Sequence, residues 1–311
     1  MNNHNHRLIL NLIKLCKYTR AVQTKGVEAL AKPDRTLVSQ VDLFVQAAVI
    51  HHLSSLSPDT AILAEETVDQ ILDDPSLTDS LNHHLTELGI QQDARKLIAK
   101  GTHAPSQSTY WCLDPIDGTR GFLRGDHYAI ALALITNNEI KTSFLGCPNL
   151  LGHGVLFHAD GSTARAFNLD TGTELPLTNI TASGASPILI ESLELGPRTE
   201  NFTQQFKQNL GWLTESIRMD SQSKYGAMAL GMAHCYLRLP RSPAAKEYAW
   251  DHAAGAHLIQ ALGGEVSDLD GRRLDFSQGA TLSGNRGIIA TMGLHHSTIV
   301  DQVERTDQAL L

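Results

Sequence analysis

Residues 111–122 read "WCLDPIDGTRGF" and place two aspartates, Asp114 and Asp117, three residues apart around a proline and directly before a Gly-Thr pair. The preceding "STYWCL" is aromatic and apolar, which predicts a strand that gives way to a loop at these aspartates. Loops that follow strands often carry catalytic side chains. Asp-Pro and Asp-Gly pairs are also common turn formers, so the stretch alone leaves a purely structural alternative open.

The overall composition is that of a globular protein. The chain has 311 residues, 42% of them hydrophobic and 19% charged, which suits one large domain or two packed subdomains with a substantial core. A net charge of −8 argues against broad binding of nucleic-acid polymers or anionic membranes. No apolar run approaches the roughly 20 residues of a membrane helix, and "MNNHNHR" is too polar to open a signal peptide, so we expect a cytoplasmic protein.

Cysteine and terminal histidine residues give no sign of a zinc site. The four cysteines form no C-x-x-C pair and are expected to be reduced thiols in or near the core: Cys16, Cys112, Cys147 and Cys235. His4 and His6 lie in a polar terminus, where a disordered end is far more common than a metal-binding fragment.

The first half of the chain is predicted to be α+β. Helical spacing of apolar residues is found at 7–20 and again from about Val41, and "TAILAEE" at 60–66 predicts a short strand. The polar region 69–108 has one expected helix near 76–88 and no strand signal. Three further apolar runs predict an antiparallel meander, at 128–136, 140–146 and 153–158.

The second half changes to alternating strands and helices, which predicts an α/β part. The expected strands lie at 186–192, 216–220, 235–239 and 287–291, and the expected helices at 200–210, 223–233 and 251–262. The polar stretch 169–185 is the best candidate for a linker. We therefore divide the chain into an N-terminal part, 1–182, and a C-terminal part, 183–311.

Four acidic residues lie where predicted elements end or begin: Glu65, Asp114, Asp117 and Asp251. The ends of elements in a layered α/β protein meet in one crevice, which would bring these carboxylates together. Crowded carboxylates repel one another unless divalent cations balance their charge. Oxygen ligands without a cysteine or histidine pattern favour Mg²⁺ or Mn²⁺ over zinc.

The loop around Pro115 suits such a site. The proline stiffens the loop, so Asp114 and Asp117 can both point inward while the Ile116 carbonyl offers a third oxygen. Gly118 and Thr119 would present backbone N–H groups and a hydroxyl to a phosphate. Two cations roughly 3.5–4 Å apart could then activate a water and stabilise the leaving oxygen of a phosphate ester.

Each acidic residue also has a structural alternative. Asp251 could cap the helix that follows it. Asp42 lies three residues after Ser39 and resembles a capping box with Asp in place of Glu. Glu65 and Glu66 could be a solvated strand end. Spacing alone does not reject these alternatives, but the order in which the residues occur together favours the functional interpretation.

That order resembles a known superfamily. The pieces "LVSQVD" (37–42), "AEE" (64–66), "LDPIDGTRGF" (113–122) and "WDHAAG" (250–255) with its later Gly-Gly resemble the lithium-sensitive, magnesium-dependent phosphatases. These include inositol monophosphatases, fructose-1,6-bisphosphatases and 3′(2′),5′-bisphosphate nucleotidases, and the resemblance covers about residues 8–291. The stretches 114–135, 145–150, 219–240 and 250–279 are most similar to the bisphosphate nucleotidase branch.

The resemblance implies a layered αβαβα sandwich of the sugar-phosphatase type, α+β in its N-terminal part and α/β in its C-terminal part. Two or three Mg²⁺ ions would be bound by Glu65, Asp114, the Ile116 carbonyl, Asp117 and Asp251. Catalytic roles would fall to Asp42 and Thr119, which would orient and deprotonate the attacking water, and to Glu65. Substrate contacts would come from Gly118, Thr119, Ser221, Lys224 and Arg238. The N-terminal part would thus carry most of the metal ligands, and the C-terminal part the nucleotide contacts and the last ligand.

The implied activity is hydrolysis of adenosine 3′(2′),5′-bisphosphate to AMP and phosphate, with 3′-phosphoadenosine 5′-phosphosulfate as a further substrate. This implies lithium sensitivity and a place in sulfur metabolism. Packing does not explain Lys224 and Arg238 at the sequence level, so we expect Arg238 to bind the second phosphate. An inositol (poly)phosphate phosphatase and a catalytically silent nucleotide-binding protein remain as alternatives. One departure is the absence of a histidine soon after Glu191-Ser192, where relatives often carry one.

Overall fold

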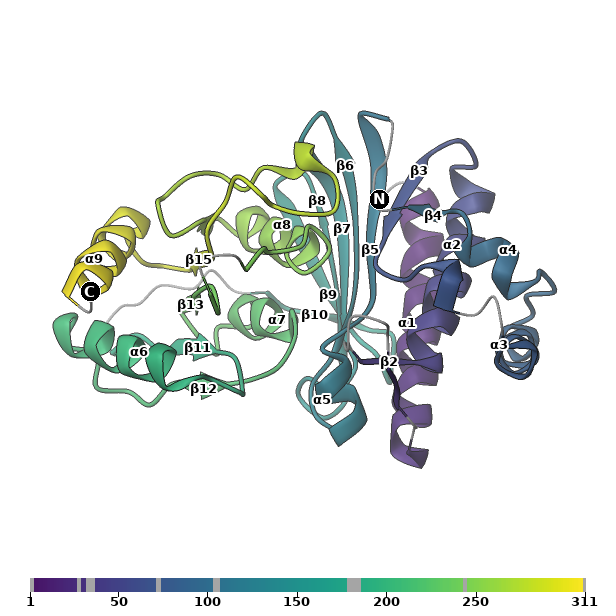
Figure 1. Ribbon diagram of the computed structural model, residues 1–311, viewed down its shortest axis with the longest axis horizontal. Helices are drawn as coiled ribbons and strands as arrows, with labels where there is room; N and C mark the ends of the chain where they lie inside the picture. Colours follow the sequence, from purple (N-terminus) through teal and green to yellow (C-terminus); the bar gives the residue numbers. More distant parts are fainter. Residues whose placement is uncertain are drawn as a thin grey trace.

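The computed structural model describes residues 3–26, 29–31, 37–70, 74–102, 107–177, 186–242 and 245–309. Its two large sheets alternate with layers of helices (Figure 1). The helices are α1 (Asn3–Lys25), α2 (Gln40–Leu56), α3 (Pro75–Glu87), α4 (Ala94–Ile98), α5 (Thr119–Arg124), α6 (Pro197–Asn209), α7 (Ser223–Ala229), α8 (Ala253–Ala261) and α9 (His296–Ala309), with 3₁₀ turns at Val68–Gln70 and Phe276–Gln278. A small antiparallel pair, β1 (Ala29–Ala31) and β2 (Leu37–Ser39), precedes α2.

The larger sheet has eight strands in the order β10-β9-β8-β7-β6-β5-β3-β4. From β5 to β10 the strands are antiparallel neighbours in chain order, which confirms the predicted meander, whereas β3 is parallel to both β4 and β5. Their bounds are β3 (Ala61–Ala64), β4 (Gly101–Thr102), β5 (Thr109–Asp117), β6 (Ala129–Thr136), β7 (Glu139–Cys147), β8 (Val155–Asp160), β9 (Thr163–Asn168) and β10 (Glu174–Leu175).

Both faces of this sheet are buried, and β5 shows how. Successive side chains of a strand point to opposite faces. Trp111 and Leu113 pack into the core beneath α1 and α2, while Tyr110 and Cys112 pack into the core shared with α7 and α8. Burial on both faces explains why "TYWCL" is continuously apolar rather than alternating with polar residues.

The second sheet has the order β12-β11-β13-β15-β14 and is mixed. β11 is parallel to β12 and β13, and β15 is antiparallel to β13 and β14. Ile288 and Ala290 face the core shared with α7 and α8, whereas Ile289 packs with α6 and α9 on the other side. The strands are β11 (Leu189–Glu191), β12 (Ile217–Arg218), β13 (Cys235–Arg238), β14 (Glu265–Ser267) and β15 (Ile288–Thr291).

The order of layers is therefore helices α1 and α2, the large sheet, helices α7 and α8, the smaller sheet, and helices α6 and α9 (Figure 1). This is the predicted αβαβα sandwich. The four cysteines are buried and unpaired, also as expected.

Several local expectations were wrong. Region 69–108 contains β4 as well as α4, and part of the expected linker 169–185 is β10, which pairs with β9. His4 and His6 lie in α1, so the expected disordered end is helical. The helix expected from residue 251 begins at Ala253, and β14 and α9 were not predicted. The division at 182/183 stays a prediction and falls in 178–185, outside the described residues.

Candidate active site

The aspartates of the opening motif lie at the end of β5, where its pairing with β6 shifts. Asp114 pairs with Ala131 and Asp117 with Ala129, so β5 has one residue more than β6 between these pairs. Pro115 fits such a bulge because it has no N–H to donate to the ladder. The expected loop at Asp114 is therefore wrong, because β5 continues to Asp117 with a bulge, and the bulge brings the Asp114 and Asp117 carboxylates together.

Gly118 is required by the next turn. Its φ of 86° lies in the left-handed region, and a Cβ there would lie 2.8 Å from the Cβ of Ser221. Glycine therefore allows the strand end to approach the segment that leads into α7. The contact brings the predicted phosphate-binding residues Gly118 and Ser221 side by side, although they are about a hundred residues apart in the sequence.

Three carboxylates meet at this point. Oxygens of Asp114, Asp117 and Asp251 lie within 4.8 Å of one another. Burial, followed by the charges of Glu65 and Asp117, raises the pKa of Asp114 well above its usual range. Burial and then Asp251 raise the pKa of Asp117 to about 6, and burial also raises the pKa of Asp251. We call Glu65, Asp114, Asp117 and Asp251 the acidic end of the site.

The acidic end fits a divalent cation. Asp114 is 2% exposed, and its Oδ1 has no hydrogen-bond partner among the described residues. A buried carboxylate oxygen without a partner is costly, and a hard cation would satisfy it together with the neighbouring carboxylates. Glu65 follows β3 and lines the same cavity as Asp117 and Asp251.

Asp251 does not cap α8. The N-cap position is His252, which makes no side-chain capping bond, while Asp251 Oδ2 accepts a hydrogen bond from Arg238 at 3.5 Å. The capping alternative for Asp251 is therefore wrong, and its carboxylate is directed into the site.

Asp42 lies in the first turn of α2 and is fully buried. Its Oδ1 accepts a hydrogen bond from the Thr119 hydroxyl at 3.0 Å, and the same hydroxyl lies 3.3 Å from the Ile116 carbonyl. The structure thus brings together the two residues that the resemblance pairs. The Ser39 side chain, which the capping-box alternative needs, is outside the described side chains.

Gln222 joins the two sides of the acidic end and was missed by the sequence analysis. Its backbone N–H donates to Asp117 Oδ2 at 2.5 Å. Its side chain donates to the Trp250 carbonyl at 2.8 Å and accepts from the Gly255 N–H at 3.0 Å. One buried residue therefore fixes Asp117 relative to the turn that carries Asp251.

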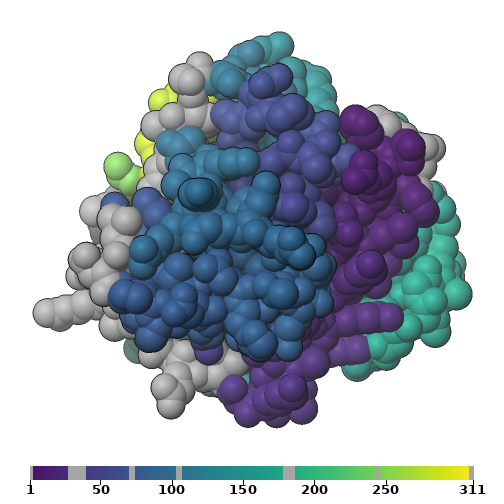
Figure 2. Space-filling view, turned by 90° about the vertical axis from the view of Figure 1, so that its right-hand side faces the viewer, coloured from purple at the N-terminus to yellow at the C-terminus, as the bar shows by residue number. Residues whose placement is uncertain are grey.

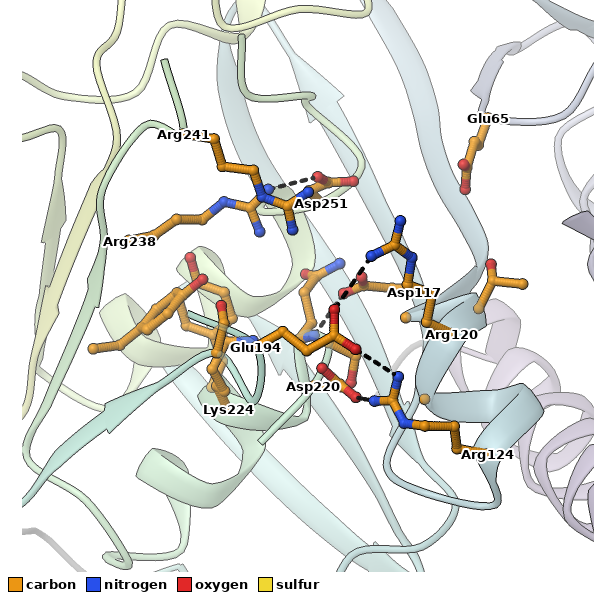
Figure 3. A pocket seen from close by; sticks show the side chains of 18 residues that line it. Glu65, Asp117, Arg120, Arg124, Glu194, Asp220, Lys224, Arg238, Arg241 and Asp251 are labelled. Carbon is orange, nitrogen blue, oxygen red and sulfur yellow. Dashed lines mark hydrogen bonds and ion pairs between the residues drawn. The ribbon is translucent and has the colours of Figure 1, made fainter. Parts of the chain in front are cut away.

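The same cavity also has five cationic side chains in its lining. We call Arg120, Arg124, Lys224, Arg238 and Arg241 the basic end; with Glu65, Asp117 and Asp251 they line a cavity of about 370 Å³ (Figure 3). Lys224 is buried, donates to the Met219 carbonyl at 3.2 Å and lies 5.2 Å from the centroid of the Tyr236 ring. Burial lowers the pKa of Lys224 to about 8.

Arg238 has two acidic partners. Its Nε lies 2.7 Å from Glu247, and its Nη2 lies 3.5 Å from Asp251. Burial acts to raise the pKa of Glu247, but the hydrogen bond from His252 and the charge of Arg238 outweigh it and lower that pKa to about 2. Lys224 and Arg238 thus both have partners within the protein, which the sequence alone did not reveal.

Arg120 and Arg124 are further cations that the sequence analysis did not single out. Arg120 pairs with Glu194 at 3.2 Å, and Arg124 pairs with Glu194 at 3.1 Å and with Asp220 (Figure 3). Their i,i+4 spacing directly after the Asp-Gly-Thr motif was the available signal. Glu194 stands three residues after Glu191.

Comparison with known proteins gives a consistent result. Residues 7–308 match the inositol monophosphatase family. The 3′(2′),5′-bisphosphate nucleotidase of Emericella nidulans is 31% identical over 90% of this chain and 91% of its own. The enzyme of that name from Schizosaccharomyces pombe is 34% identical over 84% and 82%. A solved IMPase/NADP phosphatase, complexed with Mg²⁺ and phosphate, is similar with a TM-score of 0.66 and 17% identity over 96% and 94%.

Among the helices that the structure describes, none has the length and apolar character needed to cross a bilayer.

Proposed function

Because the chain belongs to the inositol monophosphatase family, we propose that it is a Mg²⁺-dependent phosphomonoesterase that converts adenosine 3′(2′),5′-bisphosphate to AMP and phosphate. The observation that carries this proposal is one cavity with a crowded acidic end and a basic end. The first suits cations and a scissile phosphate, and the second suits a further anionic group on the same substrate.

The proposed metal ligands are the predicted ones: Glu65, Asp114, the Ile116 carbonyl, Asp117 and Asp251. Two arguments support them, the unpartnered Asp114 oxygen and the close approach of three carboxylates. When bound, Mg²⁺ supplies charge that lowers the pKa of a coordinated water and neutralises the leaving oxygen. The number of ions, two or three, is part of the proposal.

Asp42 and Thr119 are proposed to handle the proton of the attacking water. The Thr119 hydroxyl donates to Asp42, so its oxygen remains free to accept a hydrogen bond from that water. Asp42 can then accept the proton as the water attacks phosphorus, and Glu65 would orient the water from the other side. When the ester bond breaks, the ribose oxygen leaves with the bonding electron pair and takes up one proton from solvent to become the hydroxyl of AMP, and Asp42 returns its proton to solvent, so that protons balance.

Gly118 and Thr119 are proposed to contact the scissile phosphate, and Ser221, Lys224 and Arg238 to form the nucleotide side of the cavity. The Lys224 and Arg238 contacts described above support a rigid wall rather than mobile groups. Action on 3′-phosphoadenosine 5′-phosphosulfate, lithium inhibition, a role in sulfur metabolism and a cytoplasmic location remain predictions. An inositol phosphate phosphatase fits less well, because relatives at about 30% identity are named as nucleotidases.

The test is phosphate release from a substrate panel, with Mg²⁺ and with excess chelator. The panel holds adenosine 3′,5′-bisphosphate, its 2′,5′ isomer, the 3′-phospho 5′-phosphosulfate, inositol 1-phosphate and 3′-AMP. We expect the highest kcat/KM for a bisphosphate nucleotide and no turnover in chelator. Faster hydrolysis of inositol 1-phosphate would overturn the nucleotidase assignment, and no release from any substrate would favour a catalytically silent binding protein.

A further inference from the structure

The cations of the basic end differ in whether the protein already neutralises them. Arg120 and Arg124 are held by Glu194, and Arg124 also by Asp220. Arg238 is held by Glu247 and Asp251, and Lys224 by a backbone carbonyl and an aromatic ring. Arg241 differs from these four, because within the described part of the chain its side chain makes no ion pair, hydrogen bond or ring contact.

Arg241 is also well placed. It follows the end of β13 by three residues, and its exposed side chain is directed into the cavity beside that of Arg238 (Figure 3). It lines the 370 Å³ cavity and also a neighbouring cavity of about 690 Å³, which shares Arg238, Glu194 and Asp251 with it. A ligand that extends from the acidic end toward the larger cavity therefore passes Arg241.

We propose that Arg241 is the specificity-determining residue that binds the second, non-reacting phosphate of the substrate. This inference rests on the proposed function and deepens it. A guanidinium can donate two parallel hydrogen bonds to phosphate oxygens, and a free one does so without first breaking an internal ion pair. In a protein of net charge −8, such a cation is a local feature rather than part of a basic surface.

Arg238, the residue expected from the sequence to have this role, is less suitable. Glu247 is 5% exposed, and its contact with Arg238 Nε is 2.7 Å long. Movement of Arg238 toward a ligand would leave the buried Glu247 carboxylate with His252 as its one remaining ion-pair partner among the described residues, and removing a partner from a buried charge pair is strongly destabilising. Arg238 therefore holds Glu247 and Asp251 in place, and Arg241 binds the second phosphate of the substrate.

The experiment compares wild type, Arg241→Gln and Arg241→Lys on adenosine 3′,5′-bisphosphate and on 3′-AMP, which lacks the second phosphate. Lys246→Gln is the matched control, because Lys246 is exposed, lies on the same loop and lines only the larger of the two cavities. For Arg241→Gln we expect kcat/KM on the bisphosphate to fall about ten- to hundredfold, mainly through KM, with 3′-AMP changed less than about twofold. Arg241→Lys should be intermediate, because it keeps the charge and loses the paired donors.

Each outcome bears on a different claim. No loss, an equal loss on both substrates, or the same selective loss in Lys246→Gln would overturn the role of Arg241 while leaving the nucleotidase assignment intact. A wild-type protein that does not hydrolyse the bisphosphate would overturn the proposed function, and this inference with it.

Discussion

The two ends of the cavity treat charge in opposite ways. At the acidic end, Asp114, Asp117 and Asp251 crowd together, and burial raises the pKa of each. At the basic end, Glu194, Asp220 and Glu247 neutralise most of the arginines. The carboxylates of the acidic end thus carry excess negative charge that an external cation can balance. Most arginines of the basic end are instead balanced by acidic residues of the protein, which keeps that wall of the cavity rigid.

The difference also locates specificity. A wall whose charges are paired within the protein holds its shape but offers the substrate few free hydrogen-bond donors. Discrimination between substrates with and without a second phosphate therefore depends on Arg241, whose side chain is unpaired among the described residues. Asp251 connects the two ends, since it belongs to the carboxylate cluster and also contacts Arg238. Placement of the last proposed metal ligand therefore depends on the basic end.

Figure 2, which views the molecule from the side of α1 to α4, shows the surface formed by the N-terminal elements that cover the larger sheet.

The largest effect should come from breaking the acidic end. Asp114→Asn and Asp117→Asn should each abolish Mg²⁺-dependent phosphate release, because the site loses an anionic ligand. Without Mg²⁺, Asp114→Asn should melt at or above the wild-type temperature, since it removes a buried charge that its neighbours repel. Thermal unfolding with and without Mg²⁺ should show metal stabilisation in wild type and its loss in both variants.

The control for this series is Asp301→Asn, an exposed change on α9 away from the cavity. It should keep both activity and the response to Mg²⁺. Full turnover by either site variant, or wild-type turnover in excess chelator, would contradict the metal assignment.

A smaller effect is expected from the proton pathway beside the acidic end. Thr119→Ala should fold normally and lose about two or more orders of magnitude in kcat, and Asp42→Asn should behave likewise. Thr119→Ser is the control, because it retains the hydroxyl that donates to Asp42. If Asp42 acted only in helix capping, Asn would serve about as well and kcat would remain at the wild-type value.

The ion pair between Glu247 and Arg238 at the basic end should make the free energy of unfolding depend on pH. Glu247 has a pKa lowered to about 2, so its ion pair stabilises the fold above its ordinary pKa of about 4.5, and this stabilisation is lost as the pH falls toward 2. Glu247→Gln should cost about 3–4 kcal/mol at pH 7, since the pKa lies about 2.5 units below its ordinary value and one unit corresponds to roughly 1.4 kcal/mol.

The measurement is urea unfolding of wild type and Glu247→Gln between pH 7 and pH 3. The difference in the free energy of unfolding should shrink across the acid range. Glu215→Gln, an exposed change outside this cavity, should give a small difference that does not depend on pH. A constant difference for Glu247→Gln would mean that packing, rather than charge, explains its effect.

The same contrast explains what the sequence could predict. Asp114 and Asp117 share one strand end, so the local pattern was sufficient to place them together. The approach of Asp251 was expected because the ends of elements meet in one crevice, and the pairing of Asp42 with Thr119 followed from the resemblance; both agree with the contacts found. Partners of the basic end lie on irregular segments, such as Glu247 and Glu194, and periodicity gives no information about where those segments fold.

Errors in the fold have similar physical causes. β4 and β10 have two residues each, too few to show an alternating pattern, and their placement depends on the neighbouring strand. α9 was missed although Ile299 and Val303 lie four residues apart and are both buried. That spacing was a usable signal, obscured by the polar residues around it.

The smallest effect should come from Glu194, which holds two exposed arginines. Exposed ion pairs contribute roughly 0–1 kcal/mol, so Glu194→Gln should change the free energy of unfolding by no more than that. Arg124 keeps Asp126 and Asp220 as partners, but Arg120 loses its contact with Glu194 and becomes available to an anion. KM for adenosine 3′,5′-bisphosphate should therefore fall about two- to fivefold at low salt, a size typical of weak exposed ion pairs. This decrease in KM should become smaller as added salt screens the charge of Arg120. Glu200→Gln, which breaks a comparable exposed pair with Arg218 outside this cavity, should leave KM unchanged. A rise in KM for Glu194→Gln would instead mean that the Glu194 ion pairs hold Arg120 and Arg124 in the orientation that binds the substrate, and do not keep these arginines from the substrate.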